Sequence, residues 1–103
     1  MIPVVWSDEA VAHLAQIHSF ISSDSQKYAD KFIVKLMEAV EKLSSFPELG
    51  RRMPDVPDPT VREFIVAPYR VVYQVGRERL WIAAVVHSSR DLGSLEEKPR
   101  ELL

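Results

Sequence analysis

Three arginines and one histidine in the second half of the chain are the residues whose types could together act on a phosphate. They are Arg62, Arg70, Arg90 and His87. Histidine can exchange a proton near neutral pH, and arginine can stabilise the charge that develops when RNA is cleaved by its own 2′-hydroxyl. These residues lie on or just beyond expected strands of one meander, so they could meet on an exposed sheet face. The simpler alternative is a solvated set of arginines paired with Glu63 or Glu78, because exposed cross-strand ion pairs are common.

A second candidate is the adjacent pair Arg51 and Arg52. All eight arginines lie at or after position 51, while four of the five lysines precede it. Guanidinium groups form forked hydrogen bonds to phosphate and carboxylate, so we expect an anion-binding surface in this half of the chain. The pair lies within residues 47–60, where four prolines and one glycine predict a long loop. Long loops inside small domains are often functional.

Metal and nucleotide chemistry are not expected from this sequence. His13 and His18 are five residues apart on a predicted helix, outside the spacing that places two ligands over one metal. The chain has no cysteine and only three glycines, so it offers neither a thiolate site nor a glycine-rich phosphate loop. We therefore expect no metal and no cofactor.

The composition fits one folded domain over residues 1–103. Hydrophobic residues make up 47% of the chain and charged residues 27%, close to the average of soluble proteins. A net charge of −2 argues against a general nucleic-acid binder. No apolar run approaches the length of a membrane span, and the lack of cysteine fits a reducing compartment, so the cytoplasm is the expected location.

The first half of the chain predicts a short strand and two helices. Residues 2–6 are mostly β-branched and aromatic, and Pro3 places this strand at a sheet edge because proline cannot donate to a ladder. Ser7 is a good N-cap for a helix over residues 8–22, and apolar residues at helical spacing predict a second helix over residues 26–45. The short polar break between them predicts an antiparallel hairpin.

The second half predicts three strands, over residues 61–67, 69–75 and 80–86. Short connections require an antiparallel meander, and the apolar run at residues 80–86 predicts a central strand covered on both faces. The fold class is therefore α+β in the order β-α-α-β-β-β, with the helical hairpin packed on an antiparallel sheet. For residues 93–103 we expect a C-terminal arm or a short helix.

Several segments carry a family resemblance. They are residues 6–21, 46–51 (FPELGR), 61–63 (VRE), 69–75 (YRVVYQV) and 86–92 (VHSSRDL). Over nearly all its length the chain resembles the ParE/RelE superfamily of bacterial type II toxins. The long hairpin, the FPELGR segment and the histidine that ends the last strand place it closer to the ParE branch. The family fold is the one that the periodicity predicts.

The two branches of the superfamily imply different functions. ParE-like members bind DNA gyrase and stall it, whereas RelE-like members enter the ribosome and cut messenger RNA. Under the RelE-like alternative, Arg70 and Arg90 match phosphate-contacting arginines and His87 lies close to the histidine of some nucleolytic members. Arg62 matches less securely. Against a nuclease, residues 93–103 lack the tyrosine that some RelE-like members carry, and the chain is acidic.

The resemblance therefore implies a toxin that inhibits DNA gyrase. The alternatives are a metal-independent, ribosome-dependent messenger RNA endoribonuclease and an inactive or differently targeted relative. The resemblance also implies a cognate antitoxin that covers the hairpin and part of the sheet in a hetero-oligomer. For a gyrase inhibitor we predict a target surface outside the group of Arg62, Arg70, His87 and Arg90. It includes the proline-rich loop with Arg51 and Arg52, together with the arm from Gly93, since such a protein needs a broad contact area with arginine anchors. The alternative for Arg51 is to cap the carbonyl end of the preceding helix.

Overall fold

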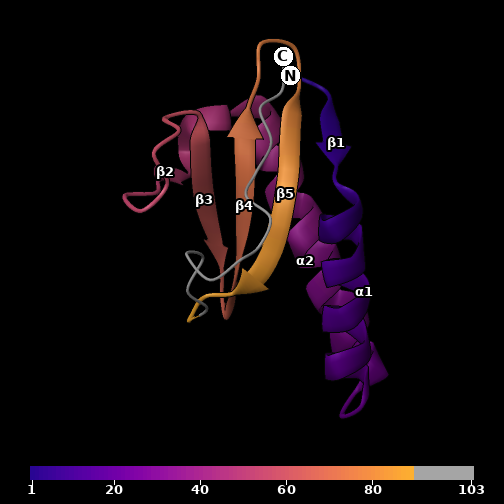
Figure 1. The fold of residues 1–103 in the computed structure, drawn as a ribbon. Coiled ribbons are helices and arrows are strands. Elements are labelled where there is room, and N and C mark those ends of the chain that lie inside the picture. Colours follow the sequence, from indigo (N-terminus) through magenta and orange to yellow (C-terminus); the bar gives the residue numbers. More distant parts are fainter. Residues whose placement is uncertain (90–103) are drawn as a thin grey trace.

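The computed structural model describes residues 1–89, which form a helical hairpin packed on one face of a sheet (Figure 1). In chain order the elements are β1 (Val4–Trp6), α1 (Asp8–Ser22), α2 (Gln26–Ser45), the 3-10 helix η1 (Pro47–Leu49), β2 (Arg51–Arg52), β3 (Val61–Val66), β4 (Tyr69–Val75) and β5 (Leu80–His87). The α+β class is confirmed, and η1 and β2 are additions inside the expected loop. The expected arm at residues 93–103 lies outside the described residues, as does Arg90. Within residues 1–89, no helix is both long and apolar enough to cross a membrane.

The sheet has five strands in the order β1-β5-β4-β3-β2. β3, β4 and β5 form the predicted antiparallel meander, which β2 extends by one more antiparallel strand. β1 corrects the prediction of a wholly antiparallel sheet, because it runs parallel to β5 with Val4 beside Leu80. Parallel neighbours need a long crossover, and here the chain passes through both helices and three strands between them. β5 therefore has a neighbour on each side, and β1 and β2 are the two edge strands.

Side-chain caps explain where both helices begin. Ser7 Oγ accepts a hydrogen bond from Ala10 N at 2.9 Å, and Ser25 Oγ accepts one from Tyr28 N at 3.1 Å. Each cap satisfies a backbone N–H that has no partner in the first turn. The Ser7 hydroxyl also donates to Ala83 O at 2.9 Å, so the start of α1 is bonded to β5. The predicted ranges of both helices are confirmed.

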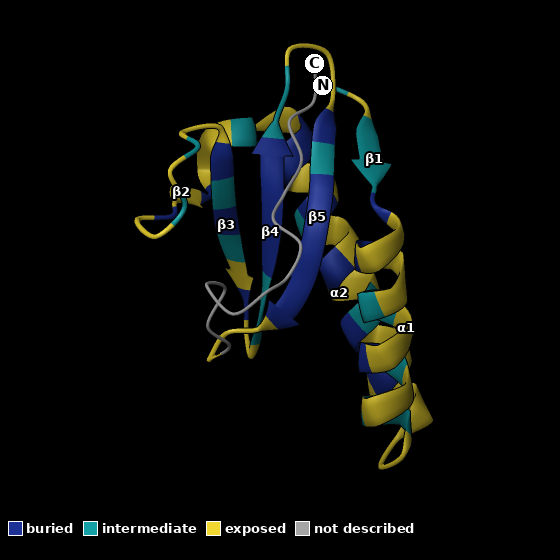
Figure 2. Cartoon of the chain, in the orientation of Figure 1, coloured by how far each residue is buried: buried dark blue, intermediate teal, exposed yellow. Residues whose placement is uncertain are grey.

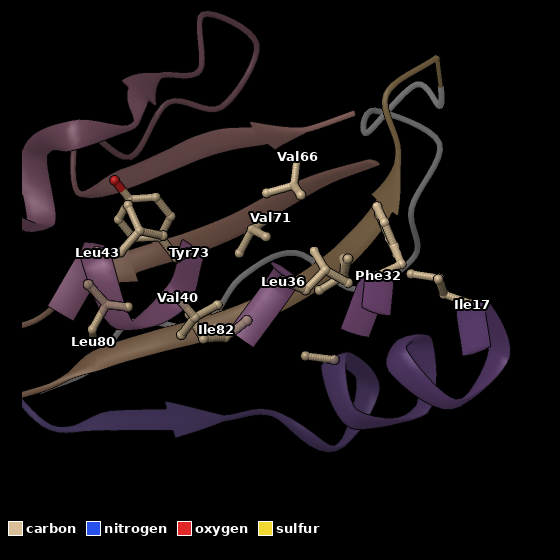
Figure 3. Close-up of a cluster of buried hydrophobic side chains, with 12 residues drawn as sticks. Ile17, Phe32, Leu36, Val40, Leu43, Val66, Val71, Tyr73, Leu80 and Ile82 are labelled. Atoms are coloured by element: carbon tan, nitrogen blue, oxygen red, sulfur yellow. The ribbon is translucent and has the colours of Figure 1, made fainter. Parts of the chain in front are cut away.

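The main core lies between the helices and the sheet face that they cover, called the helix face below (Figure 3). Its buried side chains include Ile17, Phe32, Leu36, Val40, Leu43, Val66, Val71, Tyr73, Leu80 and Ile82. The members from α2 recur every three or four positions, so one stripe of this helix faces the sheet while the rest is exposed (Figure 2). Burial of each large aliphatic side chain contributes about 1.5–3 kcal/mol.

The opposite face of the sheet, called the second face below, also carries buried apolar side chains. They are Met53, Val61, Val72, Ala83, Ala84 and Val86, with Val56 and Trp81 packed against them. The middle of β4 and most of β5 are therefore buried on both faces. This double burial explains why β5 reads as a continuous apolar run.

The ladder between β4 and β5 contains one bulge. Tyr73 lies opposite Ile82, whereas Val72 lies opposite Ala84, so Ala83 is an extra residue of β5. A bulge of this kind inverts the alternation of side chains beyond it, because two residues of one strand oppose one residue of the other. The residues of β5 before and after Ala83 therefore follow opposite rules for which face they occupy.

Candidate functional site

The first candidate surface is segment 47–52, which follows α2 and ends in the edge strand β2. The buried Tyr73 hydroxyl fixes this segment, because it accepts a hydrogen bond from Gly50 N at 2.9 Å and donates one to Pro47 O at 2.7 Å. Burial raises the pKa of Tyr73, so the hydroxyl remains protonated and keeps both bonds. Gly50 is required here, since a Cβ would lie 2.5 Å from the Tyr73 hydroxyl oxygen and 2.6 Å from Glu63 O.

Arg62 binds the same segment from β3. Its Nη1 donates to Gly50 O at 2.7 Å, a charge-assisted hydrogen bond that holds the backbone just before β2. The alternative that Arg51 caps α2 is wrong. Its Nε donates to Glu63, and within residues 1–89 its side chain makes no hydrogen bond to a carbonyl of α2.

A buried carboxylate joins two of the candidate arginines. Glu63 Oε2 accepts a hydrogen bond from Arg51 Nε at 2.7 Å, and Oε1 accepts one from Arg70 Nη1 at 2.8 Å. The side chain of Glu63 is 2% exposed, that of Arg70 13% and that of Arg51 73%. A buried carboxylate is strongly destabilising unless it is paired, so Glu63 requires its arginine partners in this Arg51–Glu63–Arg70 cluster. From the sequence, Glu63 is expected only as a solvated partner of arginines. Its place on the same face of β3 as Val61 is a single sequence signal of burial.

Arg51 and Arg52 point to opposite faces of the sheet. β2 pairs with β3 so that Arg51 lies opposite Glu63 and Arg52 lies opposite Arg62. Residues directly opposite in an antiparallel pair share a face, and successive residues alternate. Arg51 is therefore on the second face and Arg52 on the helix face. Both are exposed at the sheet edge, but they do not form one continuous patch.

His87 lies on the helix face because of the bulge at Ala83. Val85 belongs to the core under the helices, and His87 follows it by two residues. The imidazole packs edge-on against the ring of Tyr69, with ring centroids 5.6 Å apart. Arg70 is the next residue after Tyr69 and points to the second face, where it meets Glu63.

The predicted approach of Arg62, Arg70 and His87 to one another is therefore wrong. Arg70 lies on the second face, while Arg62 and His87 lie on the helix face and belong to opposite ends of the meander, beside Tyr73 and Tyr69 respectively. Arg90 lies outside the described residues. The two described arginines instead have local partners: Arg62 donates to Gly50 O, and Arg70 donates to the Glu63 carboxylate.

Residues 53–60 are tied to the second face. Asp58 accepts hydrogen bonds from Thr60 N at 2.9 Å, Thr60 Oγ1 at 2.6 Å and Gln74 Nε2 at 3.1 Å. The bonds from Thr60 lower the pKa of the Asp58 carboxyl below its ordinary value. Met53 is 6% exposed and packs in the cluster of the second face. The expected loop is thus anchored to the second face through Met53, Val56 and Asp58.

The histidines of α1 also have local partners. His13 Nδ1 accepts a hydrogen bond from Val85 N at 3.1 Å, and His18 Nε2 lies 2.7 Å from Asp30 Oδ1. In the part of the chain that the structure describes, no three His, Cys, Asp or Glu side chains are grouped as a metal ion would need.

The chain as a whole matches a known family. Residues 4–92 match the family model described as ParE toxin of type II toxin-antitoxin system, parDE. The chain belongs to the ParE toxin family. The toxin is similar to Toxin RelE2 of Caulobacter vibrioides, with 32% identity over 91 residues that cover 87% of this chain and 99% of that protein. It shares its fold with the chromosomal ParDE TA system from P. aeruginosa, with a TM-score of 0.70 and 21% identity over 84% of this chain and 96% of that chain.

These matches confirm the ParE/RelE superfamily and the role of the chain as a toxin of a type II toxin–antitoxin system. The structure adds a physical reason for the FPELGR segment, residues 46–51, which carries part of the resemblance. Its glycine, Gly50, and its arginine, Arg51, are the residues that Tyr73 and Glu63 hold against the sheet.

Proposed function

We propose that this toxin is a non-enzymatic inhibitor of DNA gyrase that a cognate antitoxin neutralises. The observation that carries the proposal is the Arg51–Glu63–Arg70 cluster. Its buried carboxylate engages the arginine that a nuclease would need for phosphate, and it fixes Arg51 at an exposed sheet edge. A gyrase target places the toxin in the bacterial cytoplasm, which a chain without cysteine fits.

The surroundings of Arg70 disfavour phosphate cleavage. Stabilisation of the transition state needs positive charge aimed at the point where negative charge develops. The Glu63 carboxylate lies 2.8 Å from Arg70 Nη1 and offsets that charge. His87 is on the other side of the sheet, so it is not within hydrogen-bond reach of a phosphate held at Arg70. The described residues therefore support an inhibitor better than a nuclease.

Segment 47–52 has the properties of a protein-binding anchor. Arginine is enriched among the residues that dominate binding energy at protein interfaces, and a group that is ordered before binding loses less entropy. Tyr73 and Arg62 hold the backbone of the segment, and Arg51 remains 73% exposed. Arg52 extends the same sheet edge from the other face. We therefore assign both arginines to the target surface.

For the antitoxin we propose the apolar groove between β1 and α2. It has a volume of about 540 Å³ and is lined by residues that include Ile2, Val4, Trp6, Met37 and Val40. An amphipathic segment of a partner binds such a groove through its apolar side chains. In the resulting hetero-oligomer, the antitoxin covers this part of the hairpin and of the sheet.

The test is a supercoiling assay with purified gyrase, the wild-type toxin and two double variants. One variant carries Arg51→Ala and Arg52→Ala, and the other carries Arg77→Ala and Arg79→Ala at two exposed arginines between β4 and β5. Both lose two positive charges, so a general charge effect would weaken them equally. We expect the first variant to require roughly thirtyfold more protein for half-inhibition, since an arginine hot spot contributes about 2 kcal/mol. The second variant should match the wild type.

A translation assay that maps cleaved messenger RNA separates the alternatives. A toxin that leaves gyrase active but cuts messenger RNA on ribosomes would refute the gyrase proposal in favour of the RelE-like alternative. In that case Arg70→Ala and Arg90→Ala should each abolish cleavage, and His87→Gln should slow it. Inactivity in both assays would indicate an inactive or differently targeted relative.

A further inference from the structure

The Arg51–Glu63–Arg70 cluster uses its two arginines differently. Arg70 is largely buried beside Glu63, so its charge compensates that of the carboxylate. Arg51 reaches the same carboxylate through Nε alone, and its side chain is 73% exposed. Within residues 1–89, the two terminal nitrogens of Arg51 donate no hydrogen bond. They are therefore donors that a ligand can approach from solvent.

The exposed end of Arg51 suits a carboxylate. Two cations and one anion leave the cluster with one net positive charge, which matches a monoanion. The terminal nitrogens of a guanidinium present two parallel N–H groups that fit the two oxygens of a carboxylate. A nucleic-acid backbone fits less well, because the whole chain carries a net charge of −2 and the Glu63 carboxylate lies directly against Arg51.

The anchoring of Arg51 affects its affinity for a ligand. An exposed arginine samples many rotamers, and ordering it on binding lowers affinity by up to about tenfold. The 2.7 Å bond from Arg51 Nε to Glu63 Oε2 orders the side chain in advance. Glu63 can act as a fixed point because it is 2% exposed and is itself held by Arg70.

We propose that Glu63 is a positioning residue for target binding, which presents Arg51 to a carboxylate on the surface of the target protein. The inference rests on the proposed function, which makes gyrase the target. It assigns Glu63 a role beyond the stability of the sheet. If stability were its whole role, an uncharged replacement that packs equally well would bind gyrase as the wild type does.

The test removes the buried ion pair in one step, with Glu63→Leu and Arg70→Met combined. Loss of Glu63 alone would leave Arg70 without its carboxylate, which is strongly destabilising. Apolar side chains of similar volume in place of a buried ion pair are often neutral or stabilising. The double variant therefore loses the acceptor for Arg51 Nε and keeps the fold, which its melting temperature and its binding to the antitoxin verify.

Binding to gyrase is measured by calorimetry in the absence of DNA. We expect the double variant to bind about tenfold more weakly than the wild type, and Arg51→Ala to cause little further loss in that background. Arg52 is the matched control because it lies on the other face of the sheet. Arg52→Ala should weaken the wild type and the double variant by the same factor.

Wild-type affinity in the double variant would overturn the role of Glu63, as would an undiminished effect of Arg51→Ala in that background. An effect that appears only when DNA is bound would overturn the carboxylate and indicate a phosphate. If the wild-type toxin does not bind gyrase, the proposed function fails. Nuclear magnetic resonance then tests separately whether Glu63 orders the Arg51 side chain. The Arg51 Nε–H signal should exchange slowly with solvent in the wild type and rapidly in the double variant. Equal exchange in both would overturn the proposal.

Discussion

Replacement of Tyr73 by phenylalanine tests how segment 47–52 is held. The change removes one oxygen atom and with it the hydrogen bonds to Gly50 N at 2.9 Å and Pro47 O at 2.7 Å. The ring stays in a core position that is 0% exposed, so packing changes little. Gly50 N then lacks a partner in a buried place, whereas Pro47 O is only partly buried and can bind water.

The magnitude follows from these two losses. A buried donor left without a partner costs about 1–3 kcal/mol, and a hydrogen bond whose acceptor reaches water contributes about 0.5–1.5 kcal/mol. We therefore expect the free energy of unfolding to fall by roughly 2–3 kcal/mol. Since about 1 kcal/mol shifts the melting temperature of a domain of this size by 4–8 °C, the melting temperature should fall by roughly 8–24 °C.

Urea unfolding measures the effect, as a lower midpoint with an unchanged slope. Tyr69→Phe is the matched control. The ring of Tyr69 also packs on the helix face, 5.6 Å from that of Phe32, but its hydroxyl makes no hydrogen bond with residues 1–89. The control should change the free energy of unfolding by less than about 0.5 kcal/mol. Equal effects of the two substitutions would refute the reasoning and remove the basis for an anchored Arg51.

Two further substitutions test the antitoxin groove and residues 53–60. Met37→Glu should weaken antitoxin binding at least about tenfold in calorimetry, because it places a charge in an apolar groove. Val11→Glu is the control, because Val11 lies on α1 outside the groove and is 53% exposed compared with 45% for Met37. It should leave antitoxin binding unchanged, and equal losses in the two variants would contradict the choice of groove. The lowered pKa of Asp58 means that its stabilising effect is present above its ordinary value of 3.8 and is lost as the pH falls through the lower folded-state value. Asp58→Asn should therefore flatten the fall in unfolding free energy between pH 4 and pH 2, and a urea series in which both proteins fall in parallel would contradict this.

The helices and most strands are predictable because their signals are local. Ser7 stands directly before the apolar spacing of α1, and the same serine makes the capping bond in the structure. β4 alternates in its apolar and polar residues over the range that the structure assigns to it. The direction of β1 is not predictable from a local signal, because nothing within residues 2–6 specifies which strand it joins. That choice depends on the unpaired edge of β5, which the chain reaches 74 residues after Trp6.

The burial of Glu63 is not predictable in the same way. An isolated glutamate in a strand is normally exposed, and its two partners lie 12 residues before it and seven after it. The register of β3 with β2 and with β4 brings both arginines to the face of Glu63. A slip of one residue in these pairings would place Arg62 on the second face instead of Glu63. The cluster that supports the proposed function is thus a consequence of strand register. The register is not predictable from the sequence, because the short turns between the strands can adopt several geometries.

The position of His87 depends on one extra residue in β5. Leu80 and Ile82 lie on the helix face, so strict alternation would put His87 on the second face, the face of Arg70. This is the arrangement that a catalytic interpretation requires. The bulge at Ala83 inverts the alternation, and the exposed His87 lies on the helix face instead.

Side chains at the start of α1, far from β5 in the sequence, bond to the bulged part of β5. β1 ends at Trp6, and beyond that point two side chains of the first turns bond to the exposed edge of β5. Ser7 Oγ donates to Ala83 O at 2.9 Å, and His13 Nδ1 accepts from Val85 N at 3.1 Å, across 76 and 72 residues of sequence. These bonds satisfy the bulged backbone where a regular neighbouring strand would have done so. The bulge thus decides the face of His87, whereas the alternation of β3 and β4 alone places Arg62 and Arg70 on opposite faces. Arginines and a histidine at a suggestive spacing in these strands therefore indicate a shared site only after the register and the bulge are known.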